Sequence, residues 1–511
     1  MSAPRRLSAP ATSLLAAVLM ALLLVSTGQA KREVSASAEA TRSQITVGLP
    51  SVVPPFDPQK YDSQYLRSVT DNINEPLVGR TGRGKLVPVL ARSMPKPINA
   101  TTWRFSLRRG IKFTNGQPFD ARSAAYSINR IIDKSLNSEL LSLVNTIKSA
   151  GVVNRYTIDV MTDGRDVLLP ARMPIIKMLP LNYASNANFL KRPVGTGPYV
   201  YVSGSGTGPI VLKRNPRYWG GNKATIQTVR IRAIPDVSTR VSALRAGEVN
   251  LITVVPPDAA RSLPKLATAV GIENPTVIFN SGFGITKDKR VRRALNLAVD
   301  KRAIAKNLFA GFASVSKCQP LSPSAFGYNP SLKAYAYNPG QARSLLRAAG
   351  ADGQSITLVT STVFSNGTQL AQVIASYWNA VGLKVNVQVP TFNDYLTAFF
   401  AKGDKHPDAV YVSTSSDLVD ASSTERMLSS KGDRSGAYAN PTVDRLFEQA
   451  AQTSNAKKRL SIYHQLMKIT CEDAPDLTLI HPKDLYGTSK NLRWTPRFDL
   501  GLLYATMRLK K

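Results

Sequence analysis

The sequence of 511 residues is poor in the side chains that carry most enzyme chemistry, with two cysteines and three histidines. His406, His464 and His481 lack the spacing of metal ligands, so we expect no metal site and no cofactor. There is no Gly-x-Ser-x-Gly motif, no His-Glu-x-x-His motif and no paired His and Cys, which argues against a hydrolase with an activated nucleophile. Composition alone leaves open a glycosidase with paired carboxylates. We expect a protein that is not an enzyme.

Long apolar runs are confined to the first 30 residues of the chain. Arg5 and Arg6 precede the apolar stretch 14–25, and small residues follow up to Ala30. This order is typical of a cleavable secretory signal, with cleavage after Ala30. An uncleaved anchor is the alternative, although the apolar stretch barely reaches across a bilayer. The arginine pair fits a twin-arginine export motif poorly. No cysteine lies directly after the apolar core, near the cleavage position, so we expect no lipid anchor and a periplasmic location.

Acidic residues are scarce, because 33 Asp and Glu stand against 66 Lys and Arg. The formal net charge of +33 falls to +31 once residues 1–30, with their two arginines, are removed. The basic residues are spread along the whole chain, and no run resembles a basic arm or a recognition helix. We therefore expect no nucleic-acid partner. Attraction to an anionic envelope surface or to anionic ligands is the consequence that we expect.

The chain is too long for one hydrophobic core, so two or three lobes are expected. Residues 356–360 and 385–389 alternate as strands around a helix at 370–381, which predicts a βαβ unit and a parallel sheet. Asp120 is expected to cap a helix over 121–132. Further helices are predicted at 71–77, 239–246, 289–308 and 341–349, and strands at 44–49, 102–107 and 277–280 and twice within 210–234. The fold class is α/β, with a more β-rich N-terminal part.

Several different motifs occur one after another along the chain. They include Pro193–Tyr199 (PVGTGPY), Lys213–Gly220 (KRNPRYWG), Arg240–Ile252 (RVSALRAGEVNLI) and Arg290–Ile304 (RVRRALNLAVDKRAI). Others are Leu86–Ser93, Thr102–Phe113, Tyr438–Asp444, Glu472–Leu479, Tyr486–Lys490 and Trp494–Asp499. Together they resemble the family 5 extracellular solute-binding proteins, the peptide, nickel and opine receptors of ABC importers. Most of these motifs we interpret as structural; in Gly195–Pro198, for example, we expect glycines with positive φ in a turn.

The resemblance implies a two-lobed periplasmic binding protein of type II, cluster C-like, with an extra N-terminal subdomain. Lobe I would comprise residues 44–276 plus 483–511, and lobe II residues 277–482. The chain would cross between the lobes near Thr276–Phe279 and Leu479–Lys483. The lobes would close on a solute, and an ABC permease would accept the liganded form.

Cys318 and Cys471 are the only cysteines, and export favours a disulfide between them, with two unpaired thiols as the alternative. A bridge over 153 positions would stabilise the fold by roughly 3–5 kcal/mol in the chain-entropy model. The resemblance places both cysteines in lobe II, which favours a structural bridge.

Candidate ligand contacts come from the resemblance. In peptide-binding relatives an aspartate in a Trp-x-x-Asp-type segment pairs with the ligand's α-ammonium, and the matching aspartate here is Asp417. Thr414 stands where Trp is common, and Leu418 and Ala421 replace the usual Tyr and Pro, which counts against a peptide. A role of Asp417 as a loop cap is the alternative. Tyr411 is a weaker aromatic candidate.

Two further segments could face the ligand. Asn280 matches an Asn that hydrogen-bonds the ligand backbone in peptide-binding relatives, and Ser281 follows it. Phe56 lies in the loop after the first strand, which faces the cleft in this family; core packing is its alternative.

The expected function is capture of a solute in the periplasm and its delivery to a membrane permease. A short peptide is the leading ligand, and opines, oligosaccharides and a nickel chelate are alternatives. A signalling or chaperone-like binder of the same fold is a further possibility, and a monomer is the default state.

Overall fold

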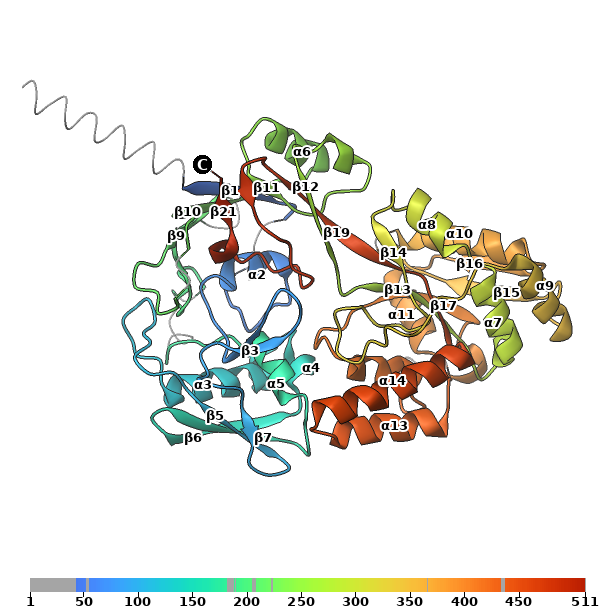
Figure 1. Ribbon diagram of the computed structural model, residues 1–511, viewed down its shortest axis with the longest axis horizontal. Coiled ribbons are helices and arrows are strands. Elements are labelled where there is room, and N and C mark those ends of the chain that lie inside the picture. The colour runs from blue at the N-terminus through green and yellow to red at the C-terminus, as the bar shows by residue number, and fades with distance from the viewer. Residues whose placement is uncertain are drawn as a thin grey trace, which may run out of the picture.

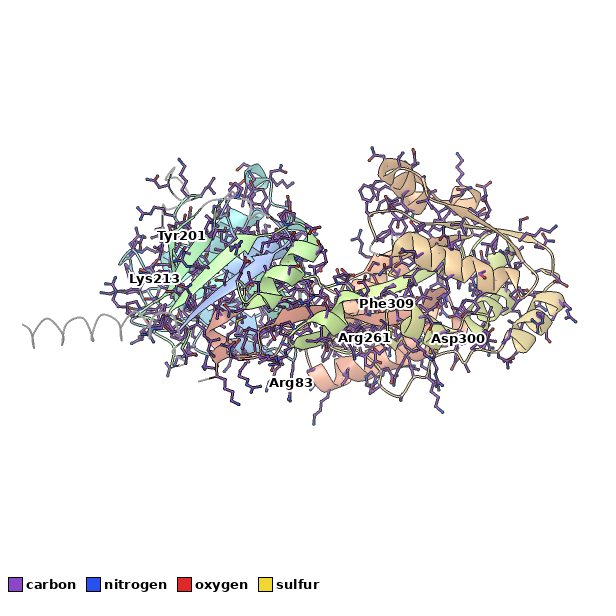
Figure 2. All side chains as sticks on the ribbon, turned by 90° about the horizontal axis from the view of Figure 1, so that it is seen from above. Arg83, Tyr201, Lys213, Arg261, Asp300 and Phe309 are labelled. Carbon is purple, nitrogen blue, oxygen red and sulfur yellow. A yellow bond between two sulfur atoms is a disulfide. The ribbon has the colours of Figure 1, made fainter. Side chains whose placement is uncertain are left out.

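The computed structural model describes residues 43–51, 55–181, 188, 190–204, 208–221, 224–364, 366–432 and 437–510. The predicted signal at residues 1–30 lies outside these ranges. Figure 1 shows two lobes side by side, which confirms the two-lobed α/β architecture. We call the lobe that contains β1 lobe I and the lobe that contains β13 lobe II. Seen from above in Figure 2, Tyr201 and Lys213 lie in lobe I and Asp300 lies in lobe II.

None of the helices in the described ranges combines the length and apolar character that crossing a membrane requires.

Lobe I is built on a mixed sheet with β1 near its middle. β1 runs parallel to β10 and β11, whereas β9 and β19 are antiparallel to their neighbours. Helix α2 (Gln64–Thr70) packs on the face that carries Ile45 and Val47, and α6 (Val237–Arg245) packs on the other face. The strands in spatial order are β12 (Leu266–Val270), β19 (Ile480–Thr488), β11 (Leu251–Ile252), β1 (Gln44–Leu49), β10 (Thr228–Ala233), β9 (Ile210–Arg214) and β8 (Tyr199–Ser203).

A smaller antiparallel sheet forms the extra subdomain beside lobe I (Figure 1). Its core joins Trp103 and Phe105 of the sheet to Ile128 and Ile131 of α3. Asp120 caps α3 through the backbone N–H groups of Arg122 and Ser123, which confirms the predicted helix and its cap. The elements are β4 (Lys96–Pro97), β5 (Thr102–Ser106), α3 (Ala121–Ile132), α4 (Leu141–Val144), β6 (Ile147–Asn154), β7 (Thr157–Thr162) and α5 (Leu169–Arg172).

Lobe II is built on a second mixed sheet with helices on both faces. β15 runs parallel to β16 with α10 between them in sequence, which confirms the predicted βαβ unit. The strands in spatial order are β16 (Lys384–Gln388), β15 (Ser355–Val359), β17 (Ala409–Thr414), β13 (Asn274–Phe279) and β18 (Asp476–Thr478). The helices are α7 (Lys289–Leu297), α8 (Lys301–Asn307), α9 (Pro339–Ala348), α10 (Gly367–Asn379), α11 (Phe392–Phe400), α12 (Glu425–Leu428), α13 (Pro441–Gln452) and α14 (Ala456–Asp473).

Small elements complete the two lobes. They are the strand pairs β2 (Val78–Arg80) with β3 (Leu86–Pro88) and β20 (Leu492–Arg493) with β21 (Arg508–Leu509), the strand β14 (Ala313–Val315), and short 3₁₀ helices such as η6 (Ala421–Thr424) and η7 (Tyr504–Thr506).

The chain crosses between the sheets along two neighbouring segments. Residues 271–273 join β12 to β13, and β19 pairs with β14 through its first residues and with β12 through residues 483–487. Burial raises the pKa of Asp484 in this crossing to about 7, and the charge of Glu273 adds to the rise. Our boundaries for the two lobes stay a prediction.

Two predicted helices differ from the structure. The helix expected at 71–77 lies at 64–70 instead, because Asn72 and Asn74 bind backbone carbonyls with their side chains and Pro76 disfavours helix at the residue before it. The helix expected over 289–308 is interrupted after Leu297, where the side chain of Asp300 caps a new helix, α8.

A disulfide joins Cys318 to Cys471 near the end of α14, with a Cα–Cα distance of 5.1 Å.

Candidate functional site

A cavity of about 420 Å³ lies between the two lobes. Lobe I supplies most of its wall through α2, the turn that follows α2, and the segment around Arg497. Lobe II contributes Asp417 and Val419 from the loop after β17, and Ile272 lies in the crossing segment. The wall is mixed in charge. Its acidic and basic members are Asp62, Arg67, Asp71, Glu75, Arg80, Lys177, Asp417, Arg497 and Asp499.

The lobe I wall is set by the end of α2. The hydroxyl of Ser63 accepts the N–H of Leu66 and begins the helix, which presents Arg67 and Asp71 to the cavity. Asp71 forms an ion pair with Lys177 at 2.8 Å. The amide of Asn72 then donates to the carbonyl of Leu502 at 2.8 Å and fixes the turn against the C-terminal segment.

Behind this turn lies the motif Pro193–Tyr199, whose glycines have a different role from the one that we predicted. A Cβ on Gly195 would stand 1.9 Å from the carbonyl oxygen of Ile73, and one on Gly197 would stand 2.6 Å from that of Asn72. Neither glycine is among those with positive φ. They are required because two backbones approach closely here, not because the turn is left-handed.

Glu75 is a buried carboxylate in the cavity wall. It accepts hydrogen bonds from Thr196 Oγ1, Tyr218 OH and Trp219 Nε1, each at 2.8 Å. Burial raises the pKa of Glu75, and these three donors together with Lys177 oppose the rise. The motif residues Thr196, Tyr218 and Trp219 thus hold one acidic group of the cavity in a single orientation.

A second acid of lobe I is held by an arginine. Asp499 accepts two hydrogen bonds from Arg497, at 2.8 and 2.6 Å. Burial alone would raise the pKa of Asp499, but the hydrogen bonds and charge of Arg497 bring the pKa below its usual range. Asp499 is therefore a charged member of the wall at neutral pH.

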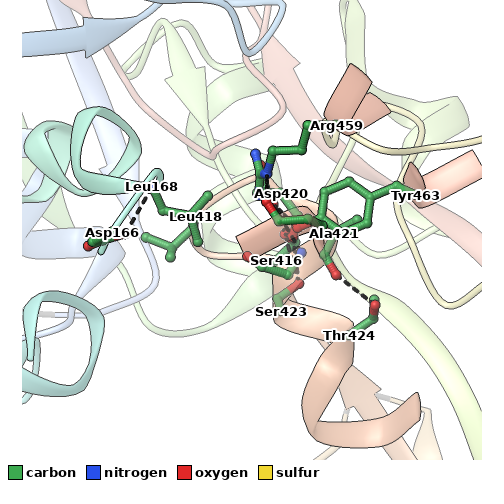
Figure 3. Close-up of polar contacts among 12 residues, drawn as sticks. Asp166, Leu168, Ser416, Leu418, Asp420, Ala421, Ser423, Thr424, Arg459 and Tyr463 are labelled. Carbon is green, nitrogen blue, oxygen red and sulfur yellow. Dashed lines mark hydrogen bonds and ion pairs between the residues drawn. The ribbon is translucent and has the colours of Figure 1, made fainter. Parts of the chain in front are cut away.

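The lobe II wall is the loop between β17 and η6, drawn in Figure 3. Ser416 and Asp420 close it, because the Ser416 hydroxyl accepts the N–H of Asp420 at 2.9 Å and donates to its carbonyl at 3.0 Å. Asp420 is itself held by Arg459 through bonds of 2.8 and 2.7 Å. Val419 has a φ of 54°, a costly conformation for a β-branched residue. The loop that carries Asp417 is therefore rigidly supported and locally strained.

Arg80 connects the two walls. Its guanidinium donates to the carbonyl oxygens of Gly84 and Ala171 in lobe I, each at 3.2 Å, and to that of Leu418 in lobe II. Burial lowers the pKa of Arg80 to about 10, which leaves the group charged at neutral pH. Leu418 also lies near Leu168 of lobe I (Figure 3), where both line a hollow between the lobes.

Asp62 and Asp417 are acids from opposite lobes that line the same cavity. Burial raises the pKa of Asp62, Arg67 lowers it, and the charges of Asp417 and Glu139 raise it further. Two like charges that interact across the cavity oppose closure of the lobes, and a cation between them would remove that cost.

Of the lobe II candidates, only Asp417 lines the cavity between the lobes. Its carboxylate accepts from Ser415 Oγ at 2.9 Å and its side chain is exposed. Thr414 lines a separate small hollow beside Asn274. Tyr411 is fully buried in the lobe II core against Phe364, and burial raises the pKa of its phenol. Neither Thr414 nor Tyr411 belongs to the cavity wall.

The remaining candidates do not line the interlobe cavity. The amide of Asn280 donates to the carbonyls of Gly403 and His406 at 3.0 and 2.9 Å, so both of its donors are used within lobe II. Ser281 does not line the cavity. Phe56 is 5% exposed and packs against Tyr201 in the core of lobe I, which is the alternative that we gave for it.

Sequence reasoning missed most of the cavity wall. Asp62, Arg67 and Lys177 carry no recognisable motif, and only folding brings them together. Arg497 does lie in a motif of the family pattern, Trp494–Asp499, whereas Glu75 directly precedes Pro76 outside those motifs. A charged residue within a family motif was therefore a signal for Arg497 alone.

Within the described ranges, no group of three or more His, Cys, Asp and Glu side chains is arranged to hold a metal ion.

Two lobes joined by two crossing segments, with a charged cavity between them, define the class of two-lobed solute-binding proteins. The model of the bacterial extracellular solute-binding proteins, family 5, matches residues 85–436, and the chain belongs to this family. The family consists of binding proteins that take up small solutes or peptides and work with ABC permeases.

Relatives with known ligands differ from one another in what they bind. The nickel-binding periplasmic protein of Escherichia coli is 29% identical over 61% of this chain and 62% of its own length. The chain thus spans less than two thirds of that relative. The glutathione-binding protein GsiB of Shigella dysenteriae is 25% identical over 89% of this chain and 92% of its own.

Solved structures share the fold over nearly the whole chain. HbpA2 from Haemophilus parasuis superposes with a TM-score of 0.84 at 20% identity, covering 92% of this chain and 100% of its own. The open, unliganded murein tripeptide binding protein MppA gives 0.82 at 20% identity, with 92% and 97% coverage. DppA from Helicobacter pylori, in complex with the peptide STSA, gives 0.70 at 24% identity, with 92% and 98% coverage.

Proposed function

We propose that the protein captures a short, zwitterionic peptide between its lobes and delivers it to an ABC permease in the inner membrane. The observation that carries this proposal is the mixed charge of the interlobe cavity. Asp62 and Asp417 offer carboxylates from opposite lobes, and Arg67 offers a guanidinium from α2. A peptide has both an ammonium and a carboxylate to pair with such groups when it is desolvated.

The same charges explain why a bound ligand would favour closure of the lobes. Without ligand, Asp417 approaches Asp62 and the two carboxylates repel each other. An ammonium group placed between them binds the closed form better than the open form, and this difference in affinity shifts the equilibrium towards closure. Arg80, which bonds to Leu418 across the lobes, would hold the closed form once it is reached.

The first experiment is a thermal-shift screen of the mature protein. The library holds di-, tri- and oligopeptides, glutathione, opines, oligosaccharides and nickel chelates. A ligand at about 100 times its dissociation constant adds about 2.7 kcal/mol to the free energy of unfolding and raises the melting temperature. We expect peptides to stabilise the protein.

The charge variant Asp417→Asn tests the role of the cavity acid. It should abolish the shift that peptides cause, whereas the matched control Asp404→Asn, an exposed acid of lobe II outside the cavity, should keep it. A shift with opines, oligosaccharides or a nickel chelate but none with peptides would keep the transport function and reject the peptide. No shift with any of these classes would favour a signalling or chaperone-like binder.

The location and state of the protein belong to the proposal as well. We propose export to the periplasm with cleavage after Ala30, no lipid anchor, a monomeric state and no catalytic activity. The family's relatives are periplasmic binding proteins, which supports the location. N-terminal sequencing of the protein from a periplasmic extract should begin at Lys31, and light scattering should give the mass of one chain.

A further inference from the structure

A second, smaller hollow lies on the extra subdomain and shares no lining residue with the interlobe cavity. Its volume is about 390 Å³. Arg108 and Arg109, which follow β5, form one side, and Arg92 and Trp219 lie on the others. The hollow contains three guanidinium groups and an indole, but no acidic side chain lines it.

The arginines of this hollow are oriented without being neutralised. Arg108 donates through Nε to the carbonyl of Val89 at 2.6 Å and stacks on Trp219 at 5.2 Å from the ring centre. Arg109 stacks on Tyr156, also at 5.2 Å. These contacts fix the guanidinium planes and leave their charge uncompensated.

Other arginines of the same subdomain do have acidic partners. Arg104 forms a bidentate pair with Asp159, with both bonds at 2.8 Å, and Arg122 pairs with Asp120 at 3.1 Å. Within the residues that the structure describes, Arg92 and Arg109 form no ion pair, and both are exposed. Three arginines without an ion pair in the described part of the chain, Arg92, Arg108 and Arg109, thus line one hollow, whereas Arg165, which also forms no ion pair there, lies outside it.

The surrounding surface adds to this positive charge. Residues 76–178 hold 17 Lys and Arg and only 6 Asp and Glu. Lys112 and Arg155 are exposed close to the hollow in sequence and structure, since Arg155 stacks on the same Tyr156 ring as Arg109, at 5.5 Å. Like charges repel one another here, and a bound anion would relieve this repulsion.

We propose that the hollow is a binding site for a phosphate group, carried either by a lipid headgroup or by a small phosphate ester. The planar fork of an arginine binds phosphate oxygens through two parallel hydrogen bonds, and converging arginines are suited to a doubly charged phosphate. Gly110 follows the arginine pair with a φ of 76°, so the chain turns there and no side chain at that position fills the hollow. This site is separate from solute capture and does not depend on the identity of the solute.

The fluorescence of Trp219 can be used to detect binding in the hollow. Its ring stacks on Arg108 in the hollow, while its Nε1 donates to Glu75 in the wall of the interlobe cavity. Trp103 and Trp378 are buried in the subdomain and lobe II cores, and Trp494 packs against Tyr486 in lobe I, so a ligand in the hollow will alter the fluorescence of Trp219 more than theirs.

The test is a fluorescence and calorimetric titration of the mature protein with glycerol phosphate, and a co-sedimentation assay with phosphatidylcholine vesicles that contain phosphatidylglycerol. The variant is Arg92→Gln with Arg109→Gln, because neither side chain has an ion-pair partner to lose. The matched control is Arg245→Gln with Arg261→Gln, two exposed arginines of lobe I outside the hollow (Arg261 is labelled in Figure 2). Both variants remove two positive charges.

We expect saturable binding by the wild type and by the control, and a dissociation constant raised by roughly tenfold or more in the hollow variant, since each charge-assisted hydrogen bond contributes on this scale. Saturable binding of free glycerol phosphate would identify a small ester as the source of the phosphate, and binding to phosphatidylglycerol vesicles alone would identify a lipid headgroup. The proposal is overturned if the wild type binds neither probe saturably, or if the hollow variant and the control weaken binding equally. Equal weakening would show that diffuse charge attracts the anion.

Discussion

The loop that carries Asp417 depends on a buried ion pair, and removal of one partner tests this dependence. Arg459 and Asp420 have side chains that are 9% and 6% exposed. The guanidinium makes two bonds to the carboxylate, a third to Tyr463 OH at 2.7 Å and a fourth to the carbonyl of Ala450 at 3.2 Å. Arg459→Met keeps much of the apolar stem and removes all four bonds.

The expected loss of stability in Arg459→Met depends on the hydrogen bonds that Asp420 retains. Loss of one partner of a buried pair costs about 3–5 kcal/mol, because the other charge stays buried. Asp420 still accepts from Ser422 N at 3.0 Å and from Tyr463 OH at 3.3 Å. We therefore expect Arg459→Met to lower the free energy of unfolding by about 3 kcal/mol, at the low end of this range.

The double variant Arg459→Met with Asp420→Asn separates the charge from the packing. It leaves no buried charge and keeps an oxygen at residue 420 to cap η6, so we expect a cost of about 1–2 kcal/mol, less than either single change. Arg122→Met is the matched control, because Arg122 pairs with the capping residue Asp120 but its side chain is 67% exposed. Its cost should stay below about 1 kcal/mol.

Urea titrations followed by circular dichroism give the free energies of unfolding of the wild type, of Arg459→Met, of Asp420→Asn, of the double variant and of the control, and calorimetry gives the affinity for the peptide found in the screen. If the cost of the double variant equals the sum of the costs of Arg459→Met and Asp420→Asn to within about 0.5 kcal/mol, such additivity would refute the argument that the pair acts as one unit. Unchanged peptide affinity in Arg459→Met would show that the loop keeps its shape without the pair.

Three further predictions concern stability. Glu75→Gln replaces an acceptor of three hydrogen bonds by an amide whose NH₂ faces a donor, so a urea titration should show a loss of about 1–3 kcal/mol. Replacement of Cys318 and Cys471 by alanine frees a loop of 153 residues in the unfolded chain, and the melting temperature should fall with a loss of about 3–5 kcal/mol. The buried carboxyl of Asp484 holds its proton up to about pH 7 in the folded state but loses it near its ordinary pKa when unfolded, so wild-type stability should fall as pH rises from about 4 to 7. Asp484→Asn should flatten this fall in melting curves across that range, and an unchanged slope would contradict the assignment.

Local signals in the sequence were sufficient to predict a helix or strand where that element is stabilised by its own residues. The helix over 121–132 has its cap, Asp120, directly before it and an apolar face at helical spacing, so its bounds were predictable. The βαβ unit from 355 to 388 was predictable because two apolar strands flank a helix with an apolar face of its own, although this helix lacks a side-chain cap. The helix over 289–308 failed because the cap at Asp300 lies inside a run that is otherwise helical.

The cavity wall could not be predicted in the same way. Asp417 was found because it stands at a fixed place in a family motif, whereas Asp62 and Lys177 depend on loops that only tertiary packing positions. Asn280 matches the family pattern, but its side-chain amide is bound to backbone carbonyls of lobe II. Phe56 lies in the expected loop, but its ring packs in the core of lobe I. A polar or aromatic residue near a cleft therefore contacts ligand only if the fold leaves its side chain free.

The position of β19 in lobe I determines the order in which that lobe can be completed. β19 lies between β11 and β12, and it is formed by residues 480–488, near the end of the chain. Until these residues are available, the sheet remains in two parts with the edges of β11 and β12 unpaired. During synthesis and export, the lobe I sheet therefore waits for residues 480–488, whereas four of the five strands of the lobe II sheet end by Thr414 and can pair earlier. A chain truncated before residue 480 would expose two open strand edges, which are sites of aggregation.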